Sequence, residues 1–287
     1  MKQTTKSILI SHLAIFLLGL SGVFGKLLSL PSLIITLGRV LFSSIALFIY
    51  MLLKKESFKL NKKKEYGYMF LLGILLAVHW ASFYEAIQLS TVALGLLSFS
   101  TFPVFVTFLE PLFFKQKLKF GDVLLALIVF GGVAIAVPSF QLENTTTLGI
   151  LIGIFSGLSY AFLSIFNKKF ASSYSGTKVA FYEQTFAIPM LLPFLFVYQP
   201  VFTAQDILLL ILLGVIFTGL AHSLFIGSLK HISTQMASII TCLEPLYAVL
   251  FAFILLGEIP TLRDVISGII ILSAVCFASF RKARQAR

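Results

Sequence analysis

Apolar runs separated by short polar connections extend along the whole chain. Ten of these runs are long enough for membrane helices, since a helix needs about 20 apolar residues to cross the hydrocarbon layer. Several connections contain only a few residues, so the helices that they join are expected to be antiparallel neighbours. The pattern predicts an all-α integral membrane protein with ten transmembrane helices, at about 7–29, 32–53, 66–89, 91–114, 121–138, 147–166, 178–199, 205–226, 233–256 and 262–280.

The composition excludes a soluble protein. Of the 287 residues, 59% are apolar and 11% are charged, and the mean hydropathy is +1.02. A soluble domain of this length cannot bury so much apolar surface and still cover itself with charge. The first apolar run continues to about residue 29 without a small-residue cleavage motif. We therefore interpret it as a retained membrane helix and not as a signal peptide.

The positive charge is distributed as a signal for membrane orientation. The formal net charge is +11, and the Lys and Arg residues lie in short tracts such as KKESFKLNKKK at 54–64. When ten helices alternate in direction, 19 of the 22 basic residues fall on one side. The positive-inside rule then places that side and both termini in the cytoplasm, so we predict a multi-pass protein of the cytoplasmic membrane. No soluble basic face is left for nucleic acid.

The two halves of the chain form a weak repeat. A shift of 142 residues aligns FYEAIQLSTVALGLLSFSTFPVF with FIGSLKHISTQMASIITCLEPLY without a gap, and it superimposes Pro103 on Pro245. Each half has five predicted helices, an odd number, so the halves are expected to have opposite orientations. The predicted halves are 1–140 and 147–281. An inverted repeat of this kind favours a binding site near the membrane midplane and alternating access to it.

These stretches resemble the ten-helix EamA type of the drug/metabolite transporter superfamily. The resemblance is carried by 83–105 and by LEPLYAVLFAFILLGEIPTLRDVISGIIILSAV at 243–275, and by Arg39 in LGRVLFSS. It extends over the whole chain as two five-helix halves. It implies a transporter of small metabolites, without indicating which metabolite or in which direction.

Ionisable side chains within the predicted helices are the first candidates for function, since such groups are costly in a membrane and usually face a cavity or a partner. From their depths we expect an outer pair, Arg39 with Glu85, and an inner pair, Glu183 with His222. Each pair would close one side of the cavity and break when that side opens. The alternative interpretation is a static salt bridge that fixes helix packing.

Glu244 and two prolines mark a further region of interest. Glu244 lies near the middle of the ninth helix and is a candidate for a proton-coupling group, or for a carboxyl group hydrogen-bonded to a neighbouring helix. Pro245 follows it, and proline frees a backbone carbonyl and loosens a helix. Pro103 is at the equivalent position, so we predict matched bends. Gly19, Gly22 and Gly25 are predicted to mark close helix packing.

Aromatic residues in HWASFYEAIQLS suggest the surface of a substrate cavity. Trp80 and Tyr84 are four residues apart and share one face of a helix, while His79 and Phe83 form the neighbouring stripe. Such a surface offers aromatic area with a few polar tips, as small-molecule sites do. The alternative is an aromatic belt at the membrane interface. The predicted cavity residues are Arg39, His79, Trp80, Phe83, Tyr84, Tyr182 and His222.

The function that these patterns favour is a secondary transporter. The sequence has no phosphate-binding loop and no group of residues at the spacing of metal ligands. We therefore expect neither a cofactor nor catalytic residues. Amino acids or related compounds are the favoured substrates, since Arg39 could bind a carboxylate and the aromatic residues a side chain or amine. Proton coupling and facilitated exchange both remain open, as do a monomer and a homodimer. The alternatives are an exporter of drugs or cationic compounds and, from another class, a polytopic membrane enzyme.

Overall fold

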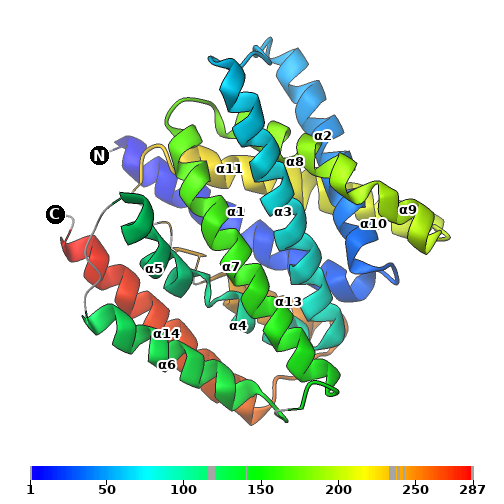
Figure 1. Cartoon of the computed structure of the whole chain (residues 1–287). Coiled ribbons are helices and arrows are strands. Elements are labelled where there is room, and N and C mark those ends of the chain that lie inside the picture. The colour runs from blue at the N-terminus through cyan, green and yellow to red at the C-terminus, as the bar shows by residue number, and fades with distance from the viewer. Residues whose placement is uncertain are drawn as a thin grey trace.

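A computed structural model gives the structure of the chain and describes residues 2–114, 120–139, 141–232, 237, 240–241 and 243–285. Every regular element of these residues is helical, and the helices run roughly from upper left to lower right in Figure 1. The first half contains α1 (Lys2–Leu27), α2 (Ser32–Leu53), α3 (Lys63–Leu89), α4 (Val92–Phe99), α5 (Phe102–Phe114) and α6 (Phe120–Ala136). The second half contains α7 (Thr145–Ala171), α8 (Gly176–Leu191), α9 (Pro193–Tyr198), α10 (Ala204–Gly214), the π-helix η1 (Val215–Leu220), α11 (Ala221–Ser228), α13 (Glu244–Leu256) and α14 (Leu262–Gln285).

These elements confirm the all-α fold and the ten predicted spans. Seven apolar helical stretches, which together include α1–α5 and α7–α11, are long enough to cross a membrane. The shorter apolar stretches Val123–Ala136 and Glu244–Leu256, together with α14, provide the other three. Within the continuously described spans, three of the predicted ones are interrupted. These are the fourth (α4 and α5), the seventh (α8 and α9) and the eighth (α10, η1 and α11).

The two halves pack into each other in a symmetrical pattern. In the second half, the first helix (α7) packs against α3, α4 and α5, which are the third and fourth spans of the first half. In the same way α1 packs against α11 and α13. The second span of each half meets its equivalent, α2 against α8, and so does the fifth, α6 against α14 along the lower left edge of Figure 1. Each half thus makes the same contacts to the other half. Such reciprocal contacts are expected for two duplicated halves that are related by a twofold axis.

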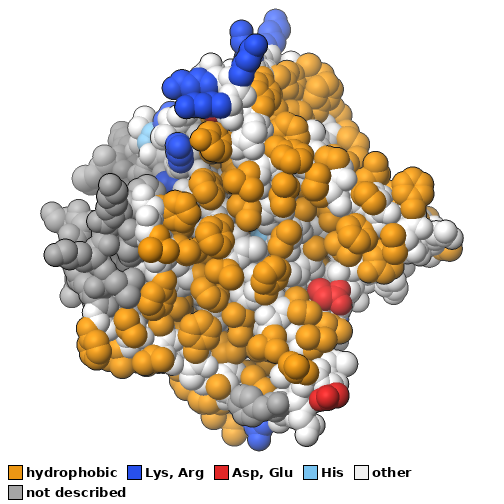
Figure 2. Space-filling view, viewed as in Figure 1, with side chains coloured by type: hydrophobic (Ala, Val, Ile, Leu, Met, Phe, Trp, Pro, Cys, Tyr) orange, Lys and Arg blue, Asp and Glu red, His pale blue; other side chains and the backbone are white. Residues whose placement is uncertain are grey.

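The surface separates apolar from basic side chains. Figure 2 shows apolar side chains over most of the visible face, and Lys and Arg side chains gathered at the upper end, beyond the ends of α2 and α3. Both termini lie at the upper left, toward the same end of the helices. The grouping is that expected for a protein with a wide apolar belt and one basic side.

The predicted packing role of the glycines in α1 is confirmed. A Cβ atom added at Gly22 would lie 3.0 Å from a methyl group of Leu96, and one at Gly25 would lie 2.9 Å from the ring of Tyr84. At Gly19 the added atom would meet the Cβ atom of Tyr247 at 2.9 Å and the carbonyl oxygen of Glu244 at 3.0 Å. Small residues at these positions let α1 approach α3, α4 and α13 closely.

The substitution Gly19→Val should therefore destabilise the fold. Its side chain has to displace the backbone of α13, and such overpacking costs about 1–3 kcal/mol of unfolding free energy. The matched control is Gly131→Val in α6, because a Cβ atom at Gly131 has no atom within 4 Å. Thermal unfolding in detergent should show a lower midpoint for the first variant only. Equal midpoints would contradict the packing account.

Candidate functional site

Arg39, a buried cation, lies at the centre of the molecule. Its side chain on α2 is 1% exposed. Nε donates a hydrogen bond to the hydroxyl of Thr218 at 3.0 Å, and Nη1 donates one to the hydroxyl of Tyr84 at 3.1 Å. Nη2 has no partner among the described residues. Because an unpaired buried donor is costly, this nitrogen is a natural point of attachment for a polar ligand.

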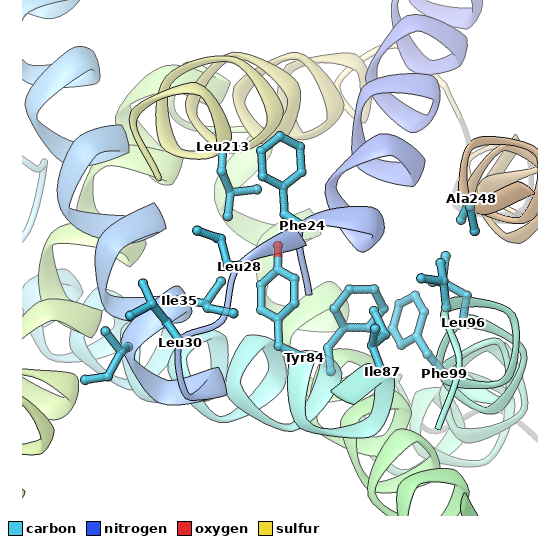
Figure 3. Close-up of a cluster of buried hydrophobic side chains, with 14 of the residues drawn as sticks. Phe24, Leu28, Leu30, Ile35, Tyr84, Ile87, Leu96, Phe99, Leu213 and Ala248 are labelled. Atoms are coloured by element: carbon cyan, nitrogen blue, oxygen red, sulfur yellow. The ribbon is translucent and has the colours of Figure 1, made fainter. Parts of the chain in front are cut away.

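The aromatic face of α3 holds the guanidinium in place. The Cζ atom of Arg39 lies 3.8 Å from the ring centre of Trp80 and 5.2 Å from that of Tyr84. Both rings are four residues apart on one face, as the sequence indicated. Tyr84 stands within a cluster of buried apolar side chains that includes Phe24 and Leu28 (Figure 3). This cluster fixes the ring, so its hydroxyl presents a rigid partner to the cation.

The Glu183–His222 pair that the sequence predicted is formed. The imidazole Nε2 of His222 lies 2.8 Å from a carboxylate oxygen of Glu183, and both side chains are buried. The second carboxylate oxygen has no hydrogen-bond partner among the described residues. The ring of Trp80 meets that of His222 edge to face, with centroids 5.4 Å apart. Trp80 therefore lies between the Arg39 guanidinium and this pair.

Glu244 adds a carboxylate to the same region. It is the first residue of α13 and is 8% exposed. None of the hydrogen bonds found among the described residues reaches its carboxylate, yet the group is near enough to Arg39 for an electrostatic interaction. The next residue, Pro245, is in the first turn of α13. Pro103 likewise follows the break between α4 and α5, so both prolines stand where a helix restarts.

Two residues of the site were missed by the sequence analysis. Thr218 lies in η1, and π-helical turns are frequent at functional sites. Gly214 and Gly219 lie just before and within η1, and a Cβ atom at Gly214 would lie 2.6 Å from Phe42 and 3.0 Å from the carbonyl oxygen of Arg39. These glycines allow η1 to reach the guanidinium, and their spacing was the available signal.

Tyr160 of α7 is the other missed residue. Its ring lies 4.7 Å from that of His79 and 5.1 Å from that of Phe102, measured between centroids. Its hydroxyl is within electrostatic range of both Glu183 and Glu244. His79 is fixed to α7 as well, by a 2.9 Å hydrogen bond between Nδ1 and the hydroxyl of Ser156. Phe83 completes the aromatic wall, 6.1 Å from His79 between ring centroids.

The structure corrects two assignments. The ion pair between Arg39 and Glu85 is not formed, because Glu85 accepts a hydrogen bond from the Ser32 hydroxyl at 2.6 Å instead. Tyr182 does not line the site, since its hydroxyl donates to the carbonyl of Phe58 in the α2–α3 connection. Each residue is the helical neighbour of a site residue, and one step along a helix turns a side chain by about 100°.

A pocket approaches the site from one end of the molecule. Tyr160 and Phe102 line it, and so does Lys168, which is exposed in the last turn of α7. We call it the vestibule, and its lining residues are Phe102, Val106, Tyr160, Ser164, Lys168, Phe225, Leu229, Ile232, Ala237 and Thr241. Lys168 belongs to the side of the chain that carries most of the basic residues. Tyr160 thus lines this pocket and is also within electrostatic range of Glu183 and Glu244.

The two halves interlock, some of the helices are interrupted, and polar side chains are buried between the halves. This combination is typical of multi-pass membrane transporters. The chain belongs to the EamA-like transporter family, whose profile matches residues 5–137 and 147–280. This places it among the drug/metabolite transporters and not among enzymes.

Two proteins that are similar in sequence are named as transporters. An "Uncharacterized transporter" of Archaeoglobus fulgidus is 32% identical over 69% of this chain and 71% of the relative. The "Uncharacterized transporter YxxF" of Bacillus subtilis is 24% identical over 99% of this chain and 93% of that protein. A solved crystal structure shares the fold, with a TM-score of 0.70 and 16% identity over 99% of both chains.

Proposed function

We propose that this transporter carries small zwitterionic metabolites of the α-amino acid type by alternating access. The halves 1–140 and 147–281 would move against each other around the central site. The observation that carries the proposal is a buried cation and a buried carboxylate near each other, each with unused hydrogen-bonding capacity. Among the described residues, Arg39 Nη2 has no hydrogen-bond partner, and no hydrogen bond reaches the Glu244 carboxylate.

A zwitterion satisfies both groups at once. Its carboxylate would accept from Arg39, its ammonium group would donate to Glu244, and its side chain would lie against the Trp80–Tyr84 face. A ligand with only one charge leaves either the guanidinium donor or the carboxylate unpaired, and an unpaired buried charged group is strongly unfavourable. The site should therefore discriminate by charge pattern more than by side-chain size.

A cationic substrate fits this arrangement less well. Export of cationic compounds needs aromatic surface and negative charge, which Trp80, Glu183 and Glu244 supply. The Arg39 guanidinium, however, is 3.8 Å from the ring centre of Trp80 and already occupies that ring as its cation. A second cation would meet it as a like charge. For this reason we favour zwitterions over organic cations.

The proposed orientation places both termini and the vestibule on the cytoplasmic side. The distribution of basic residues supports it through the positive-inside rule. A relative from Salmonella typhimurium that is 32% identical over 50% of this chain bears the name "Uncharacterized inner membrane transporter YicL". We infer the same cytoplasmic membrane for this chain, in a conformation whose open side faces inward.

Thermal unfolding with matched ligands tests the charge pattern. Leucine should raise the melting temperature of the detergent-purified protein, because a ligand that binds only the folded state stabilises it by about 2.7 kcal/mol at 100 times its dissociation constant. Isoamylamine and 4-methylpentanoate keep the apolar skeleton but lack the carboxylate and the ammonium group, respectively, and should have little effect. In Glu244→Gln, 4-methylpentanoate should match leucine. Stabilisation by amines alone would contradict the proposal and favour cation export.

A further inference from the structure

The connection between α2 and α3, residues 54–62, is bound to the second half of the chain, and we call it the strap. Tyr182 of α8 donates a hydrogen bond to the carbonyl oxygen of Phe58. Tyr174, in the connection between α7 and α8, accepts a hydrogen bond from the backbone nitrogen of Asn61 at 2.6 Å. These contacts hold the strap in place between the two halves, so its exposed side chains form a defined surface.

The strap and the start of α3 present positive charge to the outside. Both carboxylates of this segment are engaged in hydrogen bonds, Glu56 with the hydroxyl of Ser175, and Glu65 with the hydroxyl of Tyr174 at 2.6 Å. The lysine side chains, by contrast, are all exposed, and they lie at the upper end of Figure 2. We call them the basic face, and they are Lys54, Lys55, Lys59, Lys62, Lys63 and Lys64.

The local backbone does not favour lysine at three of these positions. Lys55 has a φ of 52°, a left-handed conformation that favours glycine. Its backbone nitrogen closes the end of α2 through a 3.0 Å hydrogen bond to the carbonyl oxygen of Leu52. Lys63 and Lys64 begin α3, where the positive end of the helix dipole repels cations. The local fold therefore does not account for these lysines, and their charge points to an anionic partner.

Exposed apolar and aromatic side chains border the basic face on both helices. On α2, the side chain of Leu53 is 79% exposed and comes directly before Lys54. On α3, Tyr66 and Tyr68 are exposed about one turn after the lysines at the start of the helix. Tyrosine side chains of membrane proteins collect at the level of the lipid headgroups. The basic face therefore lies where the phosphate groups of the bilayer are expected.

We propose that the basic face binds the phosphate groups of anionic phospholipids, and that the bound lipid stabilises the strap between the two halves. The assignment of these lipids to the cytoplasmic leaflet rests on the orientation proposed above. Each lysine near an anionic membrane surface adds to the binding, so a group of six gives a strong preference for anionic over neutral lipid. The rival explanation is that the lysines only orient the chain during insertion, which predicts no effect of lipid charge on the purified protein.

Lipid titration of the protein in a neutral detergent tests this proposal without any substrate. Dioleoyl phosphatidylglycerol should raise the unfolding midpoint of the wild-type protein, because a ligand of the folded state stabilises it. Dioleoyl phosphatidylcholine has the same acyl chains without net charge and should not raise it. In Lys55→Gly/Lys63→Gln/Lys64→Gln, the half-maximal effect should need about 100-fold more phosphatidylglycerol, since each lysine contributes a factor of about five.

The same triple variant separates lipid binding from a structural role. Without lipid it should melt no lower than the wild-type protein, because the substitutions relieve the left-handed backbone of Lys55 and remove positive charge from the start of α3. The matched control is Lys6→Gln/Lys230→Gln/Arg263→Gln, which removes the same number of positive charges at other exposed positions. It should keep the wild-type response to phosphatidylglycerol.

Three results would overturn the lipid surface. These are a wild-type midpoint that does not respond to phosphatidylglycerol, an equal loss of response in both triple variants, and a response to glycerol 1-phosphate as large as that to the lipid. The last result would assign the lysines to a soluble anion. The titration in detergent does not depend on membrane orientation or on substrate. A lipid response without stabilisation by leucine would therefore remove the proposed substrate class only, and the opposite pair of results would remove the lipid surface only.

Discussion

Replacing Arg39 with lysine should reduce leucine transport at least about 100-fold while the positive charge is retained. The guanidinium donates to Thr218 and Tyr84, lies over Trp80, and keeps one nitrogen for a ligand. A lysine ammonium group cannot make this planar set of contacts. Each hydrogen bond to a charged group is worth about 1.5–3 kcal/mol, so the loss of two corresponds to a factor of 100 or more. The measurement is uptake of labelled leucine into proteoliposomes.

The matched control is Arg263→Lys. Arg263 is exposed near the start of α14, so the same chemical change should leave transport at the wild-type rate. Leucine-dependent melting of Arg39→Lys separates binding from folding. A variant that melts like the wild type without ligand, but no longer responds to leucine, fits the account. Wild-type transport by Arg39→Lys would remove Arg39 from the site.

Removing His222 should destabilise the fold strongly. The substitution His222→Ala leaves the fully buried Glu183 carboxylate without the partner that now lies 2.8 Å away. Breaking a buried pair in this way costs about 3–5 kcal/mol of unfolding free energy, because an uncompensated polar group remains inside. We expect a clearly lower unfolding midpoint in detergent than for the wild type.

The double variant Glu183→Leu/His222→Leu distinguishes a gate from a purely structural pair. Apolar replacement of both partners is often neutral or stabilising, so this variant should be more stable than His222→Ala. If the pair opens and closes one side of the cavity, the stable double variant still loses leucine transport. If it transports at the wild-type rate, the pair serves packing alone.

Much of the fold could be predicted because the membrane imposes simple rules. Long apolar runs had to be helices, since only helices and closed barrels satisfy their own backbone groups in lipid. The repeat predicted duplicated halves, and Gly19, Gly22 and Gly25 predicted the close approach of α1. The breaks inside spans were only partly foreseen. Pro103 indicated the break in the fourth span, whereas η1 has no proline.

The site could be predicted residue by residue only where one helix determined the geometry. Trp80 and Tyr84 share a face at a spacing of four, and the structure places both against Arg39. Glu85 was assigned by its depth in the membrane and Tyr182 by its position beside Glu183, and the helical rotation of about 100° per residue turns both side chains elsewhere. Tyr160 and Thr218 join the site through contacts between halves. Apart from the glycines around Thr218, the sequence without its packing does not indicate such contacts.

The most direct test of the account is counterflow in proteoliposomes. Vesicles are loaded with unlabelled leucine and diluted into a trace of labelled leucine, with matched vesicles that contain Arg39→Lys protein or Glu244→Gln protein. The account predicts transient accumulation of label by the wild-type protein, and strongly reduced accumulation by both variants. Absence of leucine accumulation in wild-type vesicles that accumulate a labelled organic cation would contradict it.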